Sequence, residues 1–575
     1  MDVAEIVKLA RGDAQADLAL RNANLINVYT AEIYSTDIII AQDTIVAIGP
    51  GYEASDELDL GGRYVAPGFI DAHVHIESSM ITPPQFARAV VPRGTTTVVS
   101  DPHEIANVCG LAGIQYMLDA SEGLPLSVFV NAPSCVPATH MATAGADLGA
   151  DQLKTLLGHQ RVLGLAEVMN FPGLILGDPD VLAKLEAFSG RVIDGHSPGV
   201  TGPWLNAYVA AGVGSDHECT TLDEAQDRLR LGMYVFIRES TGARNLNDLL
   251  PAVTPDNSRR VCFCTDDRHP NDILDDGHID YILRQAIGQG LDPVTAIRMA
   301  TLNPAEWFRL RDRGAIAPGK RADLVVFSDL HDIQPEIVFC GGRIVARDNK
   351  IADLWPEPAV DESEVRDTVH LNWEALTPST FAIPATGARA RVIGVIEGQV
   401  VTQHRIENIT LEDGFACADP ERDLLKMAVI ERHKGTGGVG LGFIQGIGLT
   451  AGALAASVAH DHHNIVVIGA DDQSMLTAVR AVCQLSGGFA AANQDMVLAQ
   501  LPLPIGGLMS DQSVEAVREA MDLLLINSAA LGSDVHDPFM VMGFMALEVI
   551  PTLRLTDLGL IDVEQFRPVS LFVED

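Results

Sequence analysis

Short apolar runs alternate with amphipathic stretches through the middle of the chain, from about Ala66 to Leu310. Eight of these runs have the length and composition of buried strands, and helical periodicity follows them. The predicted strands cover residues 69–75, 95–101, 126–131, 163–168, 192–196, 212–217, 233–238 and 261–266. Eight strand–helix units in about 245 residues match the size of a (β/α)8 barrel, with an open doubly wound sheet as the alternative.

The regions on either side of this segment have the pattern of strands. Short β runs fill Asp17 to Val65, and a similar pattern returns between Gly314 and Val345. Two β-rich blocks that flank an α/β segment predict one small β-sandwich built from both. The predicted fold is therefore α/β, with four parts. They are a composite β-sandwich (1–66 plus 314–355), a TIM-like barrel (67–313), a connector (356–385) and an additional C-terminal α/β or α+β domain (386–575).

The amino-acid composition limits which binding partners and which cellular compartment are expected. The chain has 575 residues, too many for one core. Acidic residues outnumber basic ones 77 to 39, and the formal charge of −38 argues against nucleic acid or an anionic membrane as a partner. The eight cysteines form no CxxC pair, and Cys262 and Cys264 lie in an apolar run where we expect buried free thiols. With no basic and apolar leader at the N-terminus and no membrane-length apolar run, we expect a cytoplasmic protein.

Chemically capable side chains fall at the ends of most predicted strands, where a barrel builds its active site. His73 and His75 lie at the end of the first strand. Because residues two apart on a strand point to the same face, both imidazoles can reach one metal ion. The later strand ends supply Asp101, His103, Glu104, Glu167, His196, His217 and Asp266. The occurrence of these side chains at the ends of successive strands favours a barrel over an open sheet.

Four histidines, one glutamate and one aspartate at one barrel mouth can hold two divalent ions. We assign His73, His75 and Asp266 to one ion, His196 and His217 to the other, and Glu167 to both as a bridge. A water shared by two cations loses its proton near neutral pH and becomes a nucleophile. Asp266 can accept that proton and return it to a leaving group. A lone histidine is more often a core group, but six such residues in barrel order indicate a metal site.

Long motifs around these residues resemble the amidohydrolase superfamily and, within it, the bacterial adenine deaminase family. The matching segments are His75–Ser79, Asp101–Val108, Glu167–Gly173, Cys264–Pro270, Ser457–Asp461 and Leu503–Asp511. The resemblance spans almost the whole chain. It implies hydrolytic removal of ammonia from C6 of adenine to give hypoxanthine. It also implies a binuclear centre that holds manganese as the first expectation, or iron or zinc, with Glu167 in place of a carbamylated lysine. A homodimer or homotetramer is expected for this class.

Such a reaction needs a proton on the ring nitrogen N1, and His103 and Glu104 are the nearest candidates to supply it; a helix-capping pair after Pro102 is the alternative. We expect substrate contacts from Asp101, Asn170, Ser197 and Arg238, with an internal ion pair as the alternative for Arg238. Glu218 follows a ligand and is expected to orient it. One departure from the family pattern is that His462 and His463 follow the His460-Asp461 pair, where a small polar residue is usual. For His460, His462 and His463, surface positions and a mouth-covering or metal-binding role both stay open.

Two other functions stay open at this point. The first is hydrolysis of a cyclic amide, as in dihydroorotases and hydantoinases, although such relatives usually carry lysine where Glu167 stands and lack a C-terminal domain of this kind. The second is a non-catalytic protein on an amidohydrolase scaffold. Such proteins typically lose metal ligands, whereas all six positions are filled here.

Overall fold

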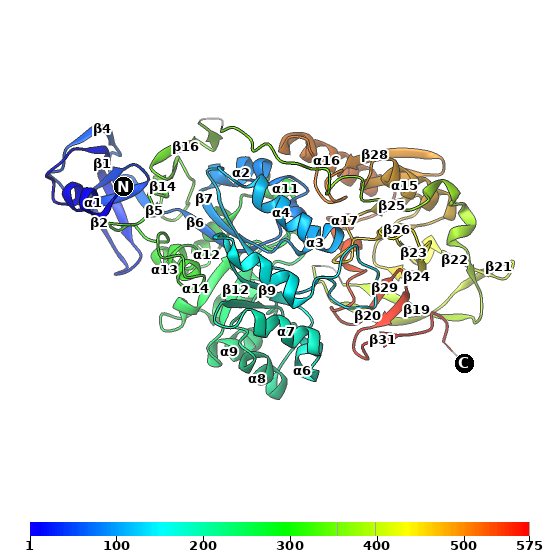
Figure 1. The fold of residues 1–575 in the computed structure, drawn as a ribbon. Coiled ribbons are helices and arrows are strands. Elements are labelled where there is room, and N and C mark those ends of the chain that lie inside the picture. The colour runs from blue at the N-terminus through cyan, green and yellow to red at the C-terminus, as the bar shows by residue number, and fades with distance from the viewer. Residues whose placement is uncertain (353–354, 397, 574–575) are drawn as a thin grey trace.

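The computed structural model describes residues 1–352, 355–396 and 398–573. Three parts lie side by side in it: an N-terminal sheet, a central set of parallel strands with helices, and a C-terminal sheet with its own helices (Figure 1). The short helix α1 (Val3–Ala10) precedes the first sheet.

The central part contains eight strands at the eight predicted positions. They are β6 (Phe69–Val74), β7 (Thr95–Ser100), β8 (Ser127–Ala132), β9 (Val162–Val168), β10 (Val192–Gly195), β11 (Ser215–Asp216), β12 (Tyr234–Arg238) and β13 (Val261–Cys264). β6 to β10 pair in parallel in chain order, as do β11 to β13. A parallel bridge between Val74 and Asp266 brings the last strand back to the first. The result is a curled parallel sheet consistent with a TIM-like barrel.

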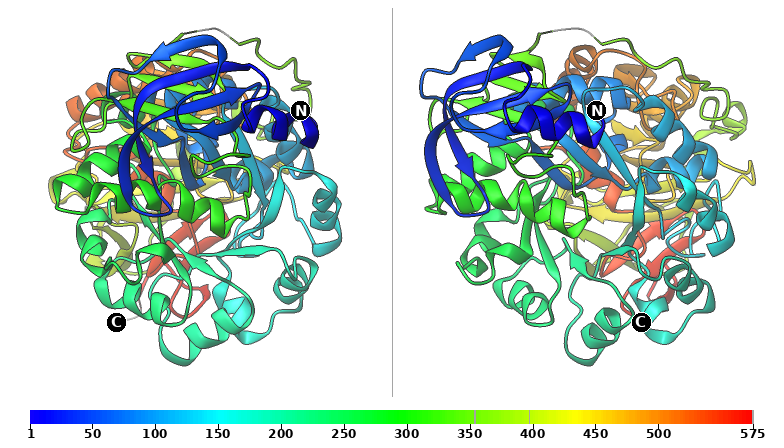
Figure 2. Two further views of the ribbon diagram at one scale, coloured as in Figure 1. Left: turned by 90° about the vertical axis from the view of Figure 1, so that its left-hand side faces the viewer. Right: turned by 60° about the vertical axis from the view of Figure 1, so that its left-hand side comes forward.

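Helices lie on the outer side of these strands (Figure 2). They include α2 (Pro83–Val90), α4 (Leu111–Ala120), α7 (Pro179–Ala187), α8 (Gly202–Ala210), α9 (Leu222–Arg230), α12 (Ile279–Gly288) and α13 (Pro293–Met299). Local capping residues determine where two of these helices begin. Thr221 and Glu224 form a capping box at α9, and Pro293 opens α13 just after the capping residue Asp292.

The N-terminal sheet joins the two β-rich blocks. Its nine strands are β1 (Ala16–Asn27), β2 (Glu32–Ala41), β3 (Thr44–Ile48), β4 (Ala54–Asp59), β5 (Tyr64–Pro67), β14 (Leu324–Phe327), β15 (Ile337–Cys340), β16 (Arg343–Arg347) and β17 (Lys350–Ile351). β5 pairs antiparallel with β14, so the strands before and after the barrel share one sheet. Its description as a sandwich stays a prediction.

The C-terminal part is built on a mixed sheet of eight strands. Their order is β20 (Thr402–Asn408), β19 (Arg389–Val395), β24 (Val439–Gln445), β23 (Leu425–Ile430), β26 (Ile465–Gly469), β25 (Ala453–Ala456), β27 (Gly488–Asn493) and β28 (Met496–Pro502). The longest helices of this part are α15 (Asp472–Gln484) and α16 (Val514–Ala530). The connector before the sheet holds the short helices Trp373–Ala375 and Pro378–Phe381.

One apolar core runs from the barrel into this sheet. Ile81, Phe86 and Ile105 of the barrel belong to the same buried cluster as Leu454 and Phe489 of the C-terminal sheet. Burial of large apolar side chains on both partners stabilises the contact by about 1.5–3 kcal/mol for each side chain. The C-terminal part is thereby held against the helix that follows β7, which is close to the barrel mouth.

The composition-based expectations have simple structural counterparts. All eight cysteines are free thiols, and Cys262 and Cys264 are buried in β13, as predicted. Among the described residues, none of the helices combines the length and apolar character needed to cross a membrane.

Candidate metal and catalytic centre

The six predicted ligands meet at the carboxyl ends of the barrel strands. His73 lies in β6 and Glu167 in β9, whereas His75, His196, His217 and Asp266 follow the last residues of their strands directly or by one position. All six side chains are almost fully buried. Parallel strands end at the same side of a barrel, so residues from distant parts of the sequence come together there.

Two histidines and two carboxylates form one half of the centre. Nε2 of His75 lies 3.2 Å from Oε1 of Glu167 and 3.1 Å from Oδ1 of Asp266. Nε2 of His73 lies 3.5 Å from each of the same two oxygens. With metal–ligand bonds of about 2.0–2.2 Å, two ligands of one ion stand about 3–3.5 Å apart. This donor set fits one divalent cation.

The other half lies on the opposite oxygen of Glu167. Its Oε2 is 2.7 Å from Nδ1 of His196 and 3.3 Å from Nε2 of His217. The ring nitrogen of His196 that faces Glu167 is Nδ1, so this atom and Nε2 of His217 are the donors that would bind a second cation. Imidazole nitrogens and carboxylate oxygens are common ligands of divalent metal ions, so this donor set also fits one. Glu167 faces two pairs of histidines with its two oxygens, which is the geometry of a bridging ligand.

Electrostatics keep the carboxylates of this centre ionised. Burial raises the pKa of Glu167, but His217, His196 and His73 outweigh it, and the pKa lies well below its ordinary value. The pKa of Asp266 is also lowered, because His73, His75 and Arg238 outweigh the effect of burial. Carboxylates must be deprotonated to bind a metal ion.

Asp266 has an unusual backbone that aims its side chain. Its φ of 57° places it in the left-handed region, which non-glycine residues adopt uncommonly and Asp more readily than most. The Asp266 N–H donates to the carbonyl of His73 at 3.0 Å, and the His75 N–H donates to the carbonyl of Asp266 at 3.3 Å. Strain of this kind gathers at functional sites, where the surrounding structure holds it.

Arg238 closes one side of the cluster by an internal ion pair, the alternative considered from the sequence. Its Nη1 lies 2.9 Å from Oδ2 of Asp266 and also contacts Glu218. Burial lowers the pKa of Arg238, but the two carboxylates Glu218 and Asp266 raise it by more. The net pKa lies above the ordinary value of arginine, so the guanidinium stays charged. Oε1 of Glu218 is 3.4 Å from Nε2 of His217. Glu218 therefore touches a predicted ligand, as expected.

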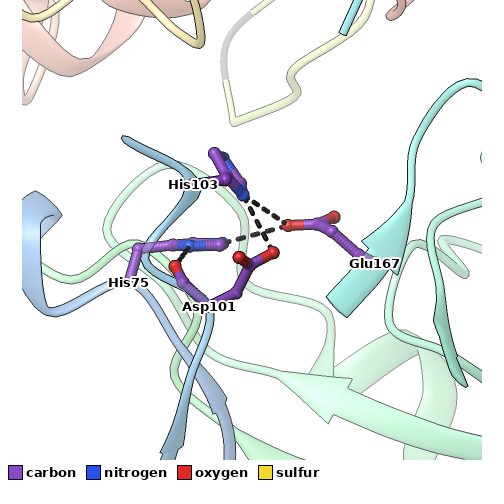
Figure 3. Close-up of side chains that lie close together, drawn as sticks. All are labelled: His75, Asp101, His103 and Glu167. Carbon is purple, nitrogen blue, oxygen red and sulfur yellow. Dashed lines mark hydrogen bonds and ion pairs between the residues drawn. The ribbon is translucent and has the colours of Figure 1, made fainter. Parts of the chain in front are cut away.

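A second polar group follows β7. Nδ1 of His103 lies 2.9 Å from Oδ2 of Asp101 and 3.5 Å from Oε1 of Glu167, while Nδ1 of His75 lies 2.9 Å from the Asp101 carbonyl (Figure 3). The helix α3 (His103–Cys109) has Pro102 at its cap position, and the Ile105 N–H in its first turn donates to Oε1 of Glu77 at 3.3 Å. Among the described residues, the side chains of His103 and Glu104 accept no hydrogen bond from this turn, so the capping interpretation of the pair is wrong. Both side chains line the cavity at the barrel mouth.

Comparisons with known proteins agree with this geometry. The amidohydrolase family model matches residues 64–345, and the model of the adenine deaminase C-terminal domain matches residues 399–567. An adenine deaminase of Desulfatibacillum aliphaticivorans is 50% identical over 99% of this chain and 99% of its own. The chain belongs to the adenine deaminase family. Adenine deaminase 2 of Carboxydothermus hydrogenoformans is 48% identical over 99% of this chain and 100% of its own.

In this member of the adenine deaminase family, the surface alternative for the C-terminal histidines is wrong. His460, His462 and His463 are 2%, 3% and 0% exposed. The reason is tertiary, because the apolar core shared with the barrel buries the connection between β25 and β26 at the barrel mouth. His460 and the adjacent Asp461 line the same cavity as the predicted metal ligands.

Two of the predicted substrate contacts have other partners. Oδ1 of Asn170 accepts the N–H of Gly173 at 2.9 Å, which caps helix α6 (Phe171–Leu176). The Ser197 hydroxyl contacts Asp216, which also accepts from Nε of Arg228 at 2.9 Å. Among the described residues that line the cavity, neither Asn170 nor Ser197 appears. Asp101 is buried beside His103, and Arg238 lines the cavity wall.

The cavity over the centre has two kinds of wall. The barrel supplies the charged floor described above. An apolar side is formed by Met169, Val400, Phe544, Leu547 and Ile550. Four of these five come from the C-terminal part, and sequence reasoning missed them because they have no chemical signature. A cavity with an apolar wall and a few charged groups suits a flat heterocycle.

Proposed function

We propose that this chain catalyses the hydrolytic deamination of adenine to hypoxanthine and ammonia. One observation carries the proposal: Glu167 presents one oxygen to His73 and His75 and the other to His196 and His217. Identity of 50% to an adenine deaminase over nearly the whole chain supports the substrate.

We infer that two divalent ions are held here, with manganese expected first and iron or zinc as alternatives. His73, His75 and Asp266 would hold one ion, His196 and His217 the other, and Glu167 both. Such ions supply the Lewis acidity that lowers the pKa of water toward neutrality. Carboxylate and imidazole ligands suit all three metals, so the donor set alone does not choose among them.

The reaction asks three things of the protein's own residues. Asp266 accepts the proton of the attacking water and returns it to the departing ammonia. His103 supplies a proton to N1 directly, or Glu104 relays one to it from a neighbouring histidine, so that the ring takes up the electron pair as oxygen adds to C6. The C6–nitrogen bond then breaks, the hydroxyl on C6 returns its remaining proton to the residue that protonated N1, and the oxygen becomes the carbonyl of hypoxanthine.

The cavity walls have roles in holding the purine. Apolar contact with Phe544 and Leu547 would bury the ring faces and exclude water. Asp101 and Arg238 are proposed to act at the polar edge, since both belong to the buried cluster next to His103 and Asp266. The packing gives less support to the predicted contacts from Asn170 and Ser197.

The test is a steady-state assay of manganese-reconstituted protein, in which ammonia release is measured for aminopurines and ring opening is measured by ultraviolet absorbance for cyclic amides. A panel should hold adenine, other aminopurines, dihydroorotate and hydantoin. Turnover of adenine that chelation abolishes and added manganese restores would support the proposal. Turnover of a cyclic amide alone would favour the other hydrolase class, and full activity in metal-free protein would overturn the metal assignment. About two ions per chain would count against a non-catalytic scaffold.

A further inference from the structure

The connection between β25 and β26, residues Ser457–Asn464, carries a dense group of buried polar side chains toward the barrel. We call it the histidine loop. It belongs to the C-terminal part, yet its contacts are with α3 of the barrel, where Glu104 and His103 lie.

Two histidines of this loop hold the two oxygens of Glu104. Nδ1 of His460 lies 2.6 Å from Oε1, and Nε2 of His463 contacts Oε2. All three side chains are at most 2% exposed. The His460 contact is a charge-assisted hydrogen bond, which is strong and directional, whereas the His463 contact is a close ion pair without hydrogen-bond geometry. The carboxylate of Glu104 therefore has its orientation fixed from the other part of the molecule.

The neighbouring residue Asp461 reaches His103. Its Oδ1 lies 3.6 Å from Nε2 of His103, whose Nδ1 is 2.9 Å from Oδ2 of Asp101. His103 thus lies between one acid from the barrel and one from the histidine loop. An acid on a ring nitrogen sets which tautomer an imidazole adopts and how the ring is turned.

The loop is anchored by a fully buried arginine. Nε of Arg432 donates to the carbonyl of His463, Nη2 donates to the carbonyl of Gly506 at 2.9 Å, and Nη1 donates to Oγ1 of Thr368 at 3.0 Å. Asn464 then donates to the carbonyl of Thr143 in the barrel at 2.8 Å. Burying a guanidinium among neutral acceptors costs folding free energy, because no opposite charge compensates for the lost hydration. We infer that this arrangement is retained because it fixes the position of the histidine loop, and not for stability alone.

The position of these side chains favours a role in catalysis over a purely structural link between the barrel and the C-terminal part. Glu104, His103, His460 and Asp461 line the same cavity as the predicted metal ligands. The ring of His460 stacks on Phe544 with centroids 4.4 Å apart and planes at 10°. A purely structural ion pair needs no place in the wall of a reaction cavity.

We propose that His460 and His463 are positioning residues for Glu104, and Asp461 for His103, so that the C-terminal part completes the active site. The proposal rests on the proposed function only in that Glu104 or His103 transfers a proton. It assigns the histidine loop a role in the orientation of those groups, not in contact with the metal ions.

The two histidines use different ring nitrogens, which gives a sharp test. An asparagine amide nitrogen takes the place of histidine Nδ1, and a glutamine amide nitrogen takes the place of Nε2. His460→Asn and His463→Gln keep the contact to Glu104, whereas His460→Gln and His463→Asn misplace it. We expect kcat to fall by about 10²–10³ in the misplaced pair and by less than about tenfold in the matched pair, with KM changed less than kcat.

His462 provides the matched control in the same loop. Its Nδ1 accepts the N–H of Asn464 at 3.1 Å, and it makes no contact with Glu104 among the described residues. His462→Asn should leave turnover within about twofold. Equal losses in all four His460 and His463 variants, or a loss in His462→Asn as large as theirs, would show that the loop acts through stability and would overturn the proposal.

A double-mutant cycle separates positioning from any independent role. If His463 acts through Glu104, His463→Asn should add less than about threefold to the loss caused by Glu104→Gln. Full additivity would overturn the proposal. Metal content and thermal midpoint are measured for every variant, so that misfolded protein is recognised.

Failure of the proposed function would look different. In that case wild-type protein releases no ammonia from adenine, and the cycle is run with whichever member of the substrate panel is hydrolysed. A crystal structure of His463→Asn adds a readout free of activity: the Glu104 carboxylate should be displaced or disordered. An unmoved carboxylate would overturn the proposal whatever the substrate.

Discussion

Oε2 of Glu167 lies 2.7 Å from Nδ1 of His196, on the side of the carboxylate away from His73 and His75. One side chain therefore connects a donor set from the first and last barrel strands with a donor set from the fifth and sixth strands. All of these side chains are buried, so water cannot take the place of either pair of histidines around the Glu167 carboxylate.

Glu167→Ala should reduce the metal content from two ions per chain to at most one, because both ions lose their shared ligand. Turnover should fall by at least about 10³ as a consequence. Metal analysis after reconstitution and gel filtration checks the first result. Glu186→Ala, which removes an exposed glutamate from α7, is the matched control and should keep wild-type values. Two ions retained in Glu167→Ala would remove Glu167 as the bridge.

Asp266→Asn should reduce kcat by about 10²–10⁴ while the free energy of unfolding changes far less. Asparagine keeps the shape and the contact with Arg238 but cannot accept a proton. Assays in excess manganese, with the bound metal measured in parallel, separate lost proton transfer from lost metal. Turnover equal to that of the wild type would reject the proton-transfer role, and urea unfolding gives the stability comparison.

The eight barrel strands could be predicted because strands buried on both faces are continuous apolar runs. Val261–Cys264 has that character, and Asp266 follows it after one intervening residue. Phe69–Val74 is also buried throughout, although it contains Asp71 and His73. Barrel topology then makes the ends of distant strands neighbours, so the sequence order of the six ligands predicts their spatial cluster. The structure places them together, while their roles as ligands stay predictions.

The histidine loop could not be placed in the same way. Whether His460 faces solvent or the barrel depends on how the apolar surface around Phe489 and Leu454 docks onto Ile105. That docking is a long-range tertiary event with no local pattern in the sequence. Asn170 is a different case, because an asparagine followed closely by a proline is a helix-start signal, and this local pattern is enough to predict a cap in place of the substrate contact.

Asn170→Ala should therefore affect stability and leave substrate binding unchanged. Loss of an N-cap costs about 1 kcal/mol, because the Gly173 N–H loses its acceptor. Urea unfolding measures this loss, and KM for adenine should stay within about twofold of the wild type. Asn170→Asp keeps an acceptor and should restore the stability. A rise in KM of tenfold or more with stability unchanged would instead return Asn170 to the substrate site.

Glu548 should give the protein a pH-dependent stability that glutamine removes. Burial raises its pKa from 4.5 to about 7, against the effect of a 2.7 Å hydrogen bond from Thr139. Because the folded protein holds this proton more tightly than the unfolded chain, the group's contribution is fully present below about pH 4.5. It declines as the pH rises and is lost above about 7. Glu548→Gln has no such proton to lose, so its stability relative to the wild type should grow by up to about 3 kcal/mol between pH 4.5 and 8. Urea unfolding of both proteins across this range is the measurement, and parallel curves would contradict a raised pKa at Glu548.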